Sequence, residues 1–228
     1  NIHANVLDHG VDLLIDGIDN VPYNQLIKFN ESMMKTNVIR LNRSKLNQHN
    51  DLLFVKENTN LTNNNYSSTI FPPPGSFLQA TVDGENAIIE TVIKGLEKIN
   101  KKKLVCELFS GCGTITLPLL SRGFKINAYE IDTQSVEAIN FASKKQGHGN
   151  KVDSQSRNLK NNPLTSEELN KFNAIIIDPP RSGAKSQFLN IAHSNVPIII
   201  SISCNINTFV RDAKILIKNN YELKWVQP

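Results

Sequence analysis

The sequence predicts an α/β protein with a doubly wound, mostly parallel sheet, preceded by a small α+β region. Two observations lead to this prediction. From residue 76 onward, short apolar runs alternate with amphipathic segments. The runs are apolar at nearly every position, as strands buried on both faces must be, and parallel strands require helical crossovers between them.

The expected elements follow one another in a regular order. Strands are expected at 104–109, 126–130, 174–178 and 196–201, with a final one near 221–226. Apolar residues at helical spacing predict a helix at 85–100, and further helices fit at 115–122, 134–145, 185–193 and 208–218. Such a sheet binds ligands beyond the carboxyl ends of its strands, so functional residues are expected just after each strand.

The first 75 residues are polar and irregular, with one clear strand signal at 11–17. The Asn-rich segment 58–68 is interpreted as a solvated loop. Pro72-Pro73-Pro74-Gly75 breaks regular structure. The chain is therefore divided into an amino-terminal α+β region, 1–75, which is partly irregular, and a main domain, 76–228.

Composition describes an ordinary globular protein, with 39% hydrophobic and 20% charged residues. Apolar stretches such as 196–202 are too short to cross a bilayer, and no signal-peptide pattern follows Asn1, so the cytoplasm is expected. Three cysteines without a CxxC pair argue against a disulfide framework, a zinc site and an iron–sulfur cluster. The net charge of +4 permits a nucleic-acid partner, although by charge alone a solvated basic face is the better interpretation. A monomer is expected.

A glycine loop follows the first strand of the main domain. Gly111 and Gly113 allow a tight turn towards a ligand, although such turns need glycine for shape alone. Thr116 occupies the position of a third glycine, which argues against a dinucleotide-binding dehydrogenase. Glu130 ends the second strand about 20 residues on, where a carboxylate commonly binds ribose hydroxyls, and an ordinary helix-start carboxylate at Glu130 or Asp132 is the alternative. Together these features favour an adenosine cofactor.

Two later strands also end in distinctive residues. Asp178-Pro-Pro-Arg181 must turn rigidly out of its strand, because proline has no amide with which to extend a sheet. Cys204 lies between a strand end and a helix start, where oriented amides stabilise the thiolate, the form that attacks. Cys106 and Cys112 are interpreted as small buried side chains.

Three segments resemble the RNA uridine C5-methyltransferases that act on tRNA and large-subunit rRNA. They are ELFSGCGTITLPL (107–119), IIIDPPRSG (175–183) and SISCNINTFVRDA (201–213), and Phe77-Leu78-Gln79 resembles the family's Phe-x-Gln element. The resemblance covers about 76–228. It implies a class I, Rossmann-like fold and methyl transfer from S-adenosylmethionine (AdoMet) to C5 of a uridine in rRNA or tRNA.

The resemblance also assigns roles to individual residues. It implies that Cys204 is the nucleophile that adds to C6 of the uracil. The residues that it places at AdoMet and the substrate are Gln79, Phe109, Thr114, Glu130, Asn158 and Asp178, of which Asn158 follows a third strand region. Phe77 is expected to stack on the base, with a core aromatic as the equal alternative, and Arg181 is expected to contact the substrate.

The sequence departs from the family pattern in three respects. Thr81 stands where many members have Asn, and the amino-terminal RNA-binding barrel and the iron–sulfur cysteines of some members are not in this sequence. The family's catalytic Glu is expected beyond residue 228, which implies an incomplete copy. An exocyclic-amine methyltransferase is the rival enzyme, although Arg181 and Cys204 argue against it. A catalytically silent RNA-binding relative is the non-enzymatic alternative.

Overall fold

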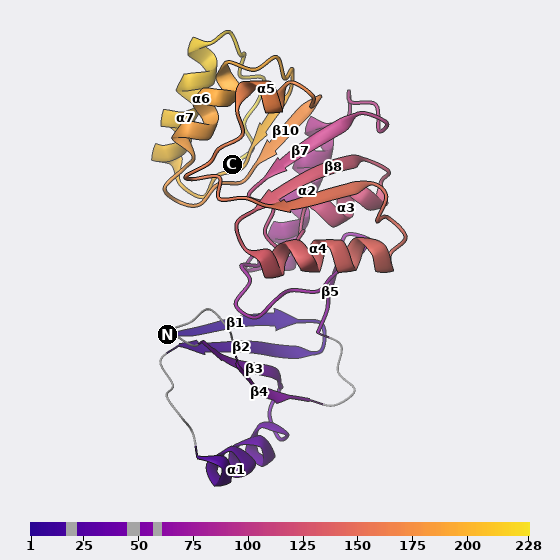
Figure 1. The fold of residues 1–228 in the computed structure, drawn as a ribbon, viewed down its shortest axis with the longest axis vertical. Helices are drawn as coiled ribbons and strands as arrows, with labels where there is room; N and C mark the ends of the chain where they lie inside the picture. The colour runs from indigo at the N-terminus through magenta and orange to yellow at the C-terminus, as the bar shows by residue number, and fades with distance from the viewer. Residues whose placement is uncertain (17–21, 45–50, 57–60) are drawn as a thin grey trace.

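The computed structural model describes residues 1–16, 22–44, 51–56 and 61–228. Residue 17 of the predicted strand and residues 58–60 of the predicted loop lie outside these ranges. Figure 1 shows a small sheet near the amino terminus and a larger sheet formed by the second part of the chain. No helix in the described ranges is long and apolar enough to cross a membrane.

The larger sheet is parallel throughout, as the sequence predicts. Its five strands have the order β11-β10-β7-β8-β9. Their bounds are β7 (Leu104–Leu108), β8 (Lys125–Glu130), β9 (Val152–Ser156), β10 (Ala174–Ile177) and β11 (Ile199–Ser201). From β7 the chain adds β8 and β9 on one side and then β10 and β11 on the other. A doubly wound sheet opens a crevice at its carboxyl edge where the strand order changes direction in this way, which here is between β7 and β10.

Helices cover both faces of this sheet (Figure 1). One face packs against α2 (Val82–Gly95), α3 (Thr116–Ser121) and α4 (Thr133–Lys145). The other packs against α5 (Ser166–Leu169), α6 (Lys185–Ala192) and α7 (Ile206–Lys218). Alternate residues of β10 point to opposite faces of the sheet. Ile176 packs in the core on the side of α2, α3 and α4, and Ile175 packs in the core on the side of α5, α6 and α7; both are fully buried. This explains why the strand is apolar at every position.

Residues 1–75 contain the small α+β region that the sequence predicts, with more regular structure than their polar composition indicates. Four strands form a mixed sheet in chain order, with one helix, α1 (Tyr23–Met33), and the strands are β1 (Ile2–Leu7), β2 (Gly10–Asp16), β3 (Val38–Ser44) and β4 (Asp51–Val55). Buried Arg40 binds both carboxylate oxygens of Asp12 at 2.7 Å and donates to the Pro72 carbonyl at 2.8 Å. Polar pairs of this kind leave no apolar pattern in a sequence.

A hairpin replaces part of the predicted solvated loop. It consists of β5 (Asn63–Asn65) and β6 (Ser68–Ile70). Ile70 is fully buried in the core shared with α3 and α4, and Phe71 packs against the same core. Residues 70 and 71 therefore pack with the main domain, although they precede the predicted boundary at residue 75.

Several element bounds also differ from prediction. The α2 helix begins three residues early because the Thr81 hydroxyl caps it, accepting from the Gly84 amide at 3.1 Å. The strand expected near 221–226 is not formed. Leu223 and Trp225 alternate as strand residues do, but they are 54% and 44% exposed, and no neighbouring strand pairs with this segment in the part of the chain that the structure describes.

Candidate active site at the carboxyl edge of the parallel sheet

The predicted site residues gather at one edge because parallel strands end together. In register, Leu108 of β7 lies beside Tyr129 of β8 and beside Ile177 of β10. Ile177 in turn lies beside Ser201 of β11. The segments that follow these strand ends carry Phe109, Thr114, Glu130, Asp178, Arg181 and Cys204.

The glycine loop after β7 has a strained, left-handed backbone. Phe109, Gly111 and Gly113 have φ values of 64°, 53° and 95°. The amides of Phe109 and Ser110 both donate to the Tyr129 carbonyl, at 2.9 and 3.2 Å, which holds the loop against the end of β8. A left-handed conformation at a non-glycine residue such as Phe109 is costly and is concentrated at functional sites.

The two glycines serve different purposes. A side chain at Gly113 would meet Ile139 at 2.9 Å, so this glycine allows α4 to approach the loop. A side chain at Gly111 would meet nothing within 4 Å. Gly111 thus borders open space, and the buried Ser110 hydroxyl beside it has no hydrogen-bond partner within the described ranges.

Glu130 fastens the glycine loop to the start of α4. Its Oε2 accepts from the Gly111 amide at 3.0 Å, and its Oε1 accepts from the amides of Ile131 and Asp132 at 2.7 and 3.2 Å. A carboxylate offers about four acceptor positions, so one remains on Oε2. Asp132, the alternative carboxylate, caps α4 by accepting from the Ser135 amide and hydroxyl.

The Phe-x-Gln element reaches this loop through its preceding residue. The Ser76 hydroxyl interacts with the Cys112 thiol, and the Ser76 carbonyl accepts from the Asn5 side chain at 2.7 Å. Phe77 is 79% exposed, so the core-aromatic alternative is wrong for this residue. Gln79 is half-buried.

Asn158 contributes to its own turn. Its side-chain oxygen accepts from the Lys160 and Asn161 amides at 3.2 and 3.1 Å. Thr114 is half-buried at the start of the segment that leads into α3. The structure gives neither residue a contact with Glu130 or Cys204 among the interactions that it describes.

Two carboxyl groups near the crevice have raised pKa values. Burial raises the pKa of Asp178 to about 6. Burial raises the pKa of Glu107 to about 8, against the opposing effect of a 2.7 Å hydrogen bond from Thr116. The negative charges of Asp178 and Glu130 add to the shift at Glu107, so the three groups share one electrostatic environment. Sequence patterns alone did not identify Glu107, because it lies inside a strand.

Cys204 is exposed in the segment between β11 and α7, whereas Cys106 and Cys112 are buried. Burial raises the pKa of Cys112 to about 12 and that of Cys106 well above its usual value. Of the three thiols, only Cys204 is open to a reagent from solvent. Its neighbour Asn205 caps α7 by accepting from the Asn207 amide at 3.0 Å.

The Cys204 loop and the Asp178 loop are tied together. The Arg181 carbonyl accepts from Asn205 Nδ2 at 3.1 Å and from the Thr208 hydroxyl at 3.3 Å. On the next turn of α7, Asp212 accepts from the Ala184 amide at 3.0 Å. We call these contacts and the hydrogen bond from Arg211 to the Ser182 carbonyl the α7 clamp.

Gly183 fits inside the α7 clamp because it has no side chain. Its φ is 74°, and a Cβ atom there would lie 2.4 Å from Arg211 Nη2 and 2.5 Å from Asp212 Oδ2. Arg211 also donates to the Ser182 carbonyl at 3.1 Å. The clamp residues Asn205, Thr208, Arg211 and Asp212 were not predicted as site residues. In the sequence they lie within the motif at 201–213, as a polar stripe at helical spacing.

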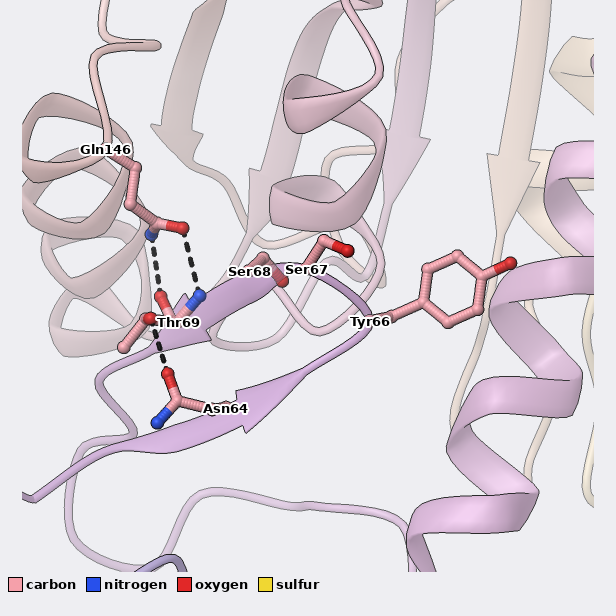
Figure 2. Close-up of a pocket in the computed structure, with 6 residues that line it drawn as sticks. All are labelled: Asn64, Tyr66, Ser67, Ser68, Thr69 and Gln146. Carbon is pink, nitrogen blue, oxygen red and sulfur yellow. Dashed lines mark hydrogen bonds between the residues drawn. The ribbon is translucent and has the colours of Figure 1, made fainter.

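Two surface hollows lie away from these residues. One has a volume of about 260 Å³ and is lined by the β5–β6 hairpin and Gln146, which are drawn in Figure 2. The other, about 610 Å³, lies between α1 and β4. Neither hollow is lined by a predicted site residue.

The sheet order, the glycine loop and the carboxylate that ends β8 define the class I AdoMet-dependent methyltransferase fold. The family model described as tRNA (uracil-5-)-methyltransferase matches residues 18–222. The chain therefore belongs to that family, as the three sequence motifs predict.

Curated relatives agree with this assignment. An uncharacterized RNA methyltransferase of Mesorhizobium japonicum is 38% identical over 162 residues, which is 71% of this chain and 38% of the relative. One of Fusobacterium nucleatum is 30% identical over 219 residues, or 89% of this chain and 44% of the relative. The chain thus spans less than half the length of these relatives.

Solved structures share the fold at low sequence identity. The tRNA (uracil-54, C5)-methyltransferase of Pyrococcus abyssi, in complex with S-adenosyl-L-homocysteine, matches with a TM-score of 0.69 and 17% identity, over 94% of this chain and 52% of that one. The tRNA m1G37 methyltransferase of M. jannaschii matches with a TM-score of 0.58 and 15% identity, over 93% and 62%.

Proposed function

We propose that this chain transfers a methyl group from AdoMet to C5 of a uridine in tRNA or rRNA through a covalent bond between Cys204 and C6. One observation carries the proposal. In a chain of the uracil-5 family, an exposed thiol follows the carboxyl end of β11, and its loop is bound to the loop after Asp178. A nucleophile and a base-holding rim are thus neighbours.

The glycine loop and Glu130 fit the chemistry of AdoMet. Open space borders Gly111, and the unpartnered Ser110 hydroxyl offers a polar contact nearby. The free acceptor position on Glu130 Oε2 suits a ribose hydroxyl. Phe109, Thr114, Gln79 and Asn158 are proposed as further cofactor contacts. Bound there, AdoMet supplies an activated methyl group.

Cys204 performs the step that uracil itself cannot. C5 of uracil is a poor nucleophile, so the thiolate adds to C6 and the electron pair of the C5–C6 double bond moves towards C5 and the O4 carbonyl. C5 then attacks the methyl carbon as the methyl–sulfur bond breaks. Loss of the C5 proton to a base restores the double bond and expels the thiolate.

Asp178, Arg181 and Phe77 are proposed to hold the uridine. Ionised Asp178 accepts a hydrogen bond from the uracil N3–H, and its pKa of about 6 keeps it mostly ionised at neutral pH. The exposed ring of Phe77 offers a stacking surface, and exposed Arg181 offers a charge for a phosphate. A flipped or unpaired nucleotide is required to reach Cys204.

The carboxylates that follow Cys204 are poorly placed as the C5 base. Asp212 is 2% exposed and binds Ala184 and Arg211. Glu222 is exposed beside Lys224 and follows the far end of α7. We therefore assign the base to neither residue. The cytoplasm remains the proposed location, because it keeps thiols such as these three reduced.

RNA that contains 5-fluorouridine tests the proposal, because fluorine at C5 blocks the final elimination. With AdoMet, the unmodified chain should form an adduct that survives denaturing electrophoresis, and Cys204→Ala should form none while binding labelled AdoMet normally. Cys112→Ala is the control and should still form the adduct. An adduct that persists in Cys204→Ala would refute the assignment. AdoMet binding without an adduct at Cys204 would favour the exocyclic-amine enzyme, and no binding would favour the silent relative.

Nucleoside analysis of the methylated product identifies the class of substrate RNA. The protein can be offered tRNA and rRNA transcripts with methyl-labelled AdoMet, followed by nucleoside analysis. Label in 5-methyluridine is expected, and the transcript that carries it names the substrate class. Label in a methylated exocyclic amine would replace the proposal by the rival activity.

A further inference from the structure

The turns that lead into the parallel strands are strongly basic. They lie at the amino edge of the sheet, opposite the edge that carries Cys204. Lysine or arginine occurs before or at the start of each of three neighbouring strands, β7, β8 and β9. We call these residues the basic edge: Lys101, Lys102, Lys103, Arg122, Lys125, Lys144, Lys145 and Lys151.

Strand register makes the basic edge continuous. Leu104 of β7 lies beside Lys125 of β8, and the Ile126 amide donates to the Lys151 carbonyl at 2.9 Å. Neighbouring strands are about 4.8 Å apart. The side chain of Lys101 lies against Gly123, with its Cδ 3.8 Å from the position of a glycine Cβ. The charges of three separate turns therefore meet on one surface.

Aromatic rings lie among these charges. The Arg122 guanidinium lies 4.3 Å from the centre of the Tyr66 ring. Lys145 lies 4.8 Å from the Phe71 ring and 5.6 Å from the Phe141 ring. Phe71 and Phe141 meet edge to face at 5.0 Å, and Phe141 is 55% exposed. Cations interleaved with accessible rings are typical of surfaces that bind single-stranded nucleic acid.

The hairpin that presents Tyr66 is held rigidly. Thr69 and Gln146 exchange two hydrogen bonds, at 2.9 and 2.8 Å, which fasten β6 to the end of α4 (Figure 2). Tyr66 and Ser67 have φ values of 47° and 64°, although turns with such angles ordinarily require glycine or asparagine. Figure 2 shows the Tyr66 ring on the side of the turn away from Gln146. The strained turn and its two bonds fix the ring beside Arg122.

Charge is distributed unevenly between the two edges. At the carboxyl edge, Arg157, Lys160 and Arg181 are balanced by Glu130, Asp132 and Asp178. Several acidic residues also lie near the basic edge. Glu97 is followed by Lys98, and Glu137 lies one turn before Phe141 on α4. Asp153 accepts from Asn127, and Asp8 accepts from Thr62 and Asn64. The chain's net charge of +4 therefore arises largely from one edge of one sheet.

We infer that the basic edge is a second RNA-contacting surface, which binds phosphates and unstacked bases of the substrate RNA away from the target uridine. The inference rests on the proposed function. Lysines at the three strand entrances neutralise phosphates, and Tyr66 and Phe141 offer faces for bases. The six residues of β8 separate the two edges by roughly 20 Å at about 3.3 Å per residue. A folded RNA reaches both edges, whereas a short oligonucleotide reaches one.

A matched pair of variants tests the inference. The edge variant is Lys102→Gln/Lys125→Gln/Lys145→Gln, and the control is Lys28→Gln/Lys35→Gln/Lys214→Gln, and all six side chains are exposed. Each variant removes three positive charges. Affinity is measured over a range of salt concentrations for a tRNA transcript and for a short uridine-containing oligonucleotide. AdoMet affinity reports the integrity of the fold.

The edge variant should bind the transcript about tenfold or more weakly than the control at about 0.1 M salt. Its slope of log affinity against log salt should be shallower by about 2 to 3, because each lost phosphate contact contributes about 0.9. The edge variant should lose more affinity for the transcript than for the oligonucleotide, which reaches only one edge at a time, and its AdoMet affinity should not change. Equal transcript affinity and slope in the two variants would overturn the inference and leave the proposed function intact. An unmodified chain that binds AdoMet but no RNA would overturn both.

Discussion

The free acceptor position of Glu130 gives a quantitative prediction for Glu130→Ala. The three amides of Gly111, Ile131 and Asp132 occupy three of about four acceptor positions. One hydrogen bond to a ribose hydroxyl therefore remains, and a bond to a charged group contributes about 1.5–3 kcal/mol. Its loss should raise the Kd for AdoMet about 10- to 150-fold.

Isothermal titration calorimetry of the purified chain with AdoMet measures this change. Glu137→Ala is the matched control, because Glu137 is an exposed carboxylate on α4 and its removal changes the charge equally. The control should bind AdoMet as the unmodified chain does. A Kd for Glu130→Ala within about twofold of the control would mean that Glu130 only fastens the glycine loop.

Three further predictions concern stability and reactivity. Gly183→Ala should lower the free energy of unfolding by more than Gly147→Ala, since both glycines have φ near 75° but only Gly183 has neighbours within 4 Å. In a urea titration, Gly147→Ala should lower this free energy by about 1–2 kcal/mol. Equal losses in the two variants would contradict the close packing of Gly183 in the α7 clamp. Burial raises the pKa of Glu107, so its contribution to the free energy of unfolding is full below pH 4.5 and is lost as pH rises towards about 8, by up to about 1.4 kcal/mol per pH unit. Glu107→Gln should abolish this slope in urea titrations. An unchanged slope would refute the raised pKa. Iodoacetamide should alkylate Cys204 alone in the native chain, and mass spectrometry that finds Cys112 modified first would contradict its burial.

The sequence predicted the parallel sheet well because buried strands are apolar and their helices amphipathic. It placed a third strand region before Asn158 but gave it no bounds, because the residues of β9, Val152–Ser156, are largely polar in an edge strand. In the amino-terminal α+β region it predicted only the strand at 11–17 individually, and Asp12 and Arg40 form a buried polar pair there. The β5–β6 hairpin escaped prediction because Tyr66-Ser67 is not a usual turn pair.

The candidate site was predictable in part, for similar physical reasons. Strand ends and motifs indicated Cys204, Asp178 and Glu130, since a parallel sheet brings its carboxyl ends together. The clamp residues lie within the motif at 201–213, but their hydrogen bonds to a distant loop could not be predicted from local sequence. Glu107 was hidden for a related reason: its role depends on burial, which residue type alone does not reveal.

The α7 clamp also bears on how an RNA would be selected. Because the Cys204 and Asp178 loops are bound to each other, neither swings independently to grasp a base. Under the proposed function, the motion needed for encounter then falls on the nucleic acid, and its cost is that of unstacking the nucleotide. Uridines already turned outwards in loops would react faster than paired ones, so the rate would follow the intrinsic opening of the RNA and not a closing motion of the protein.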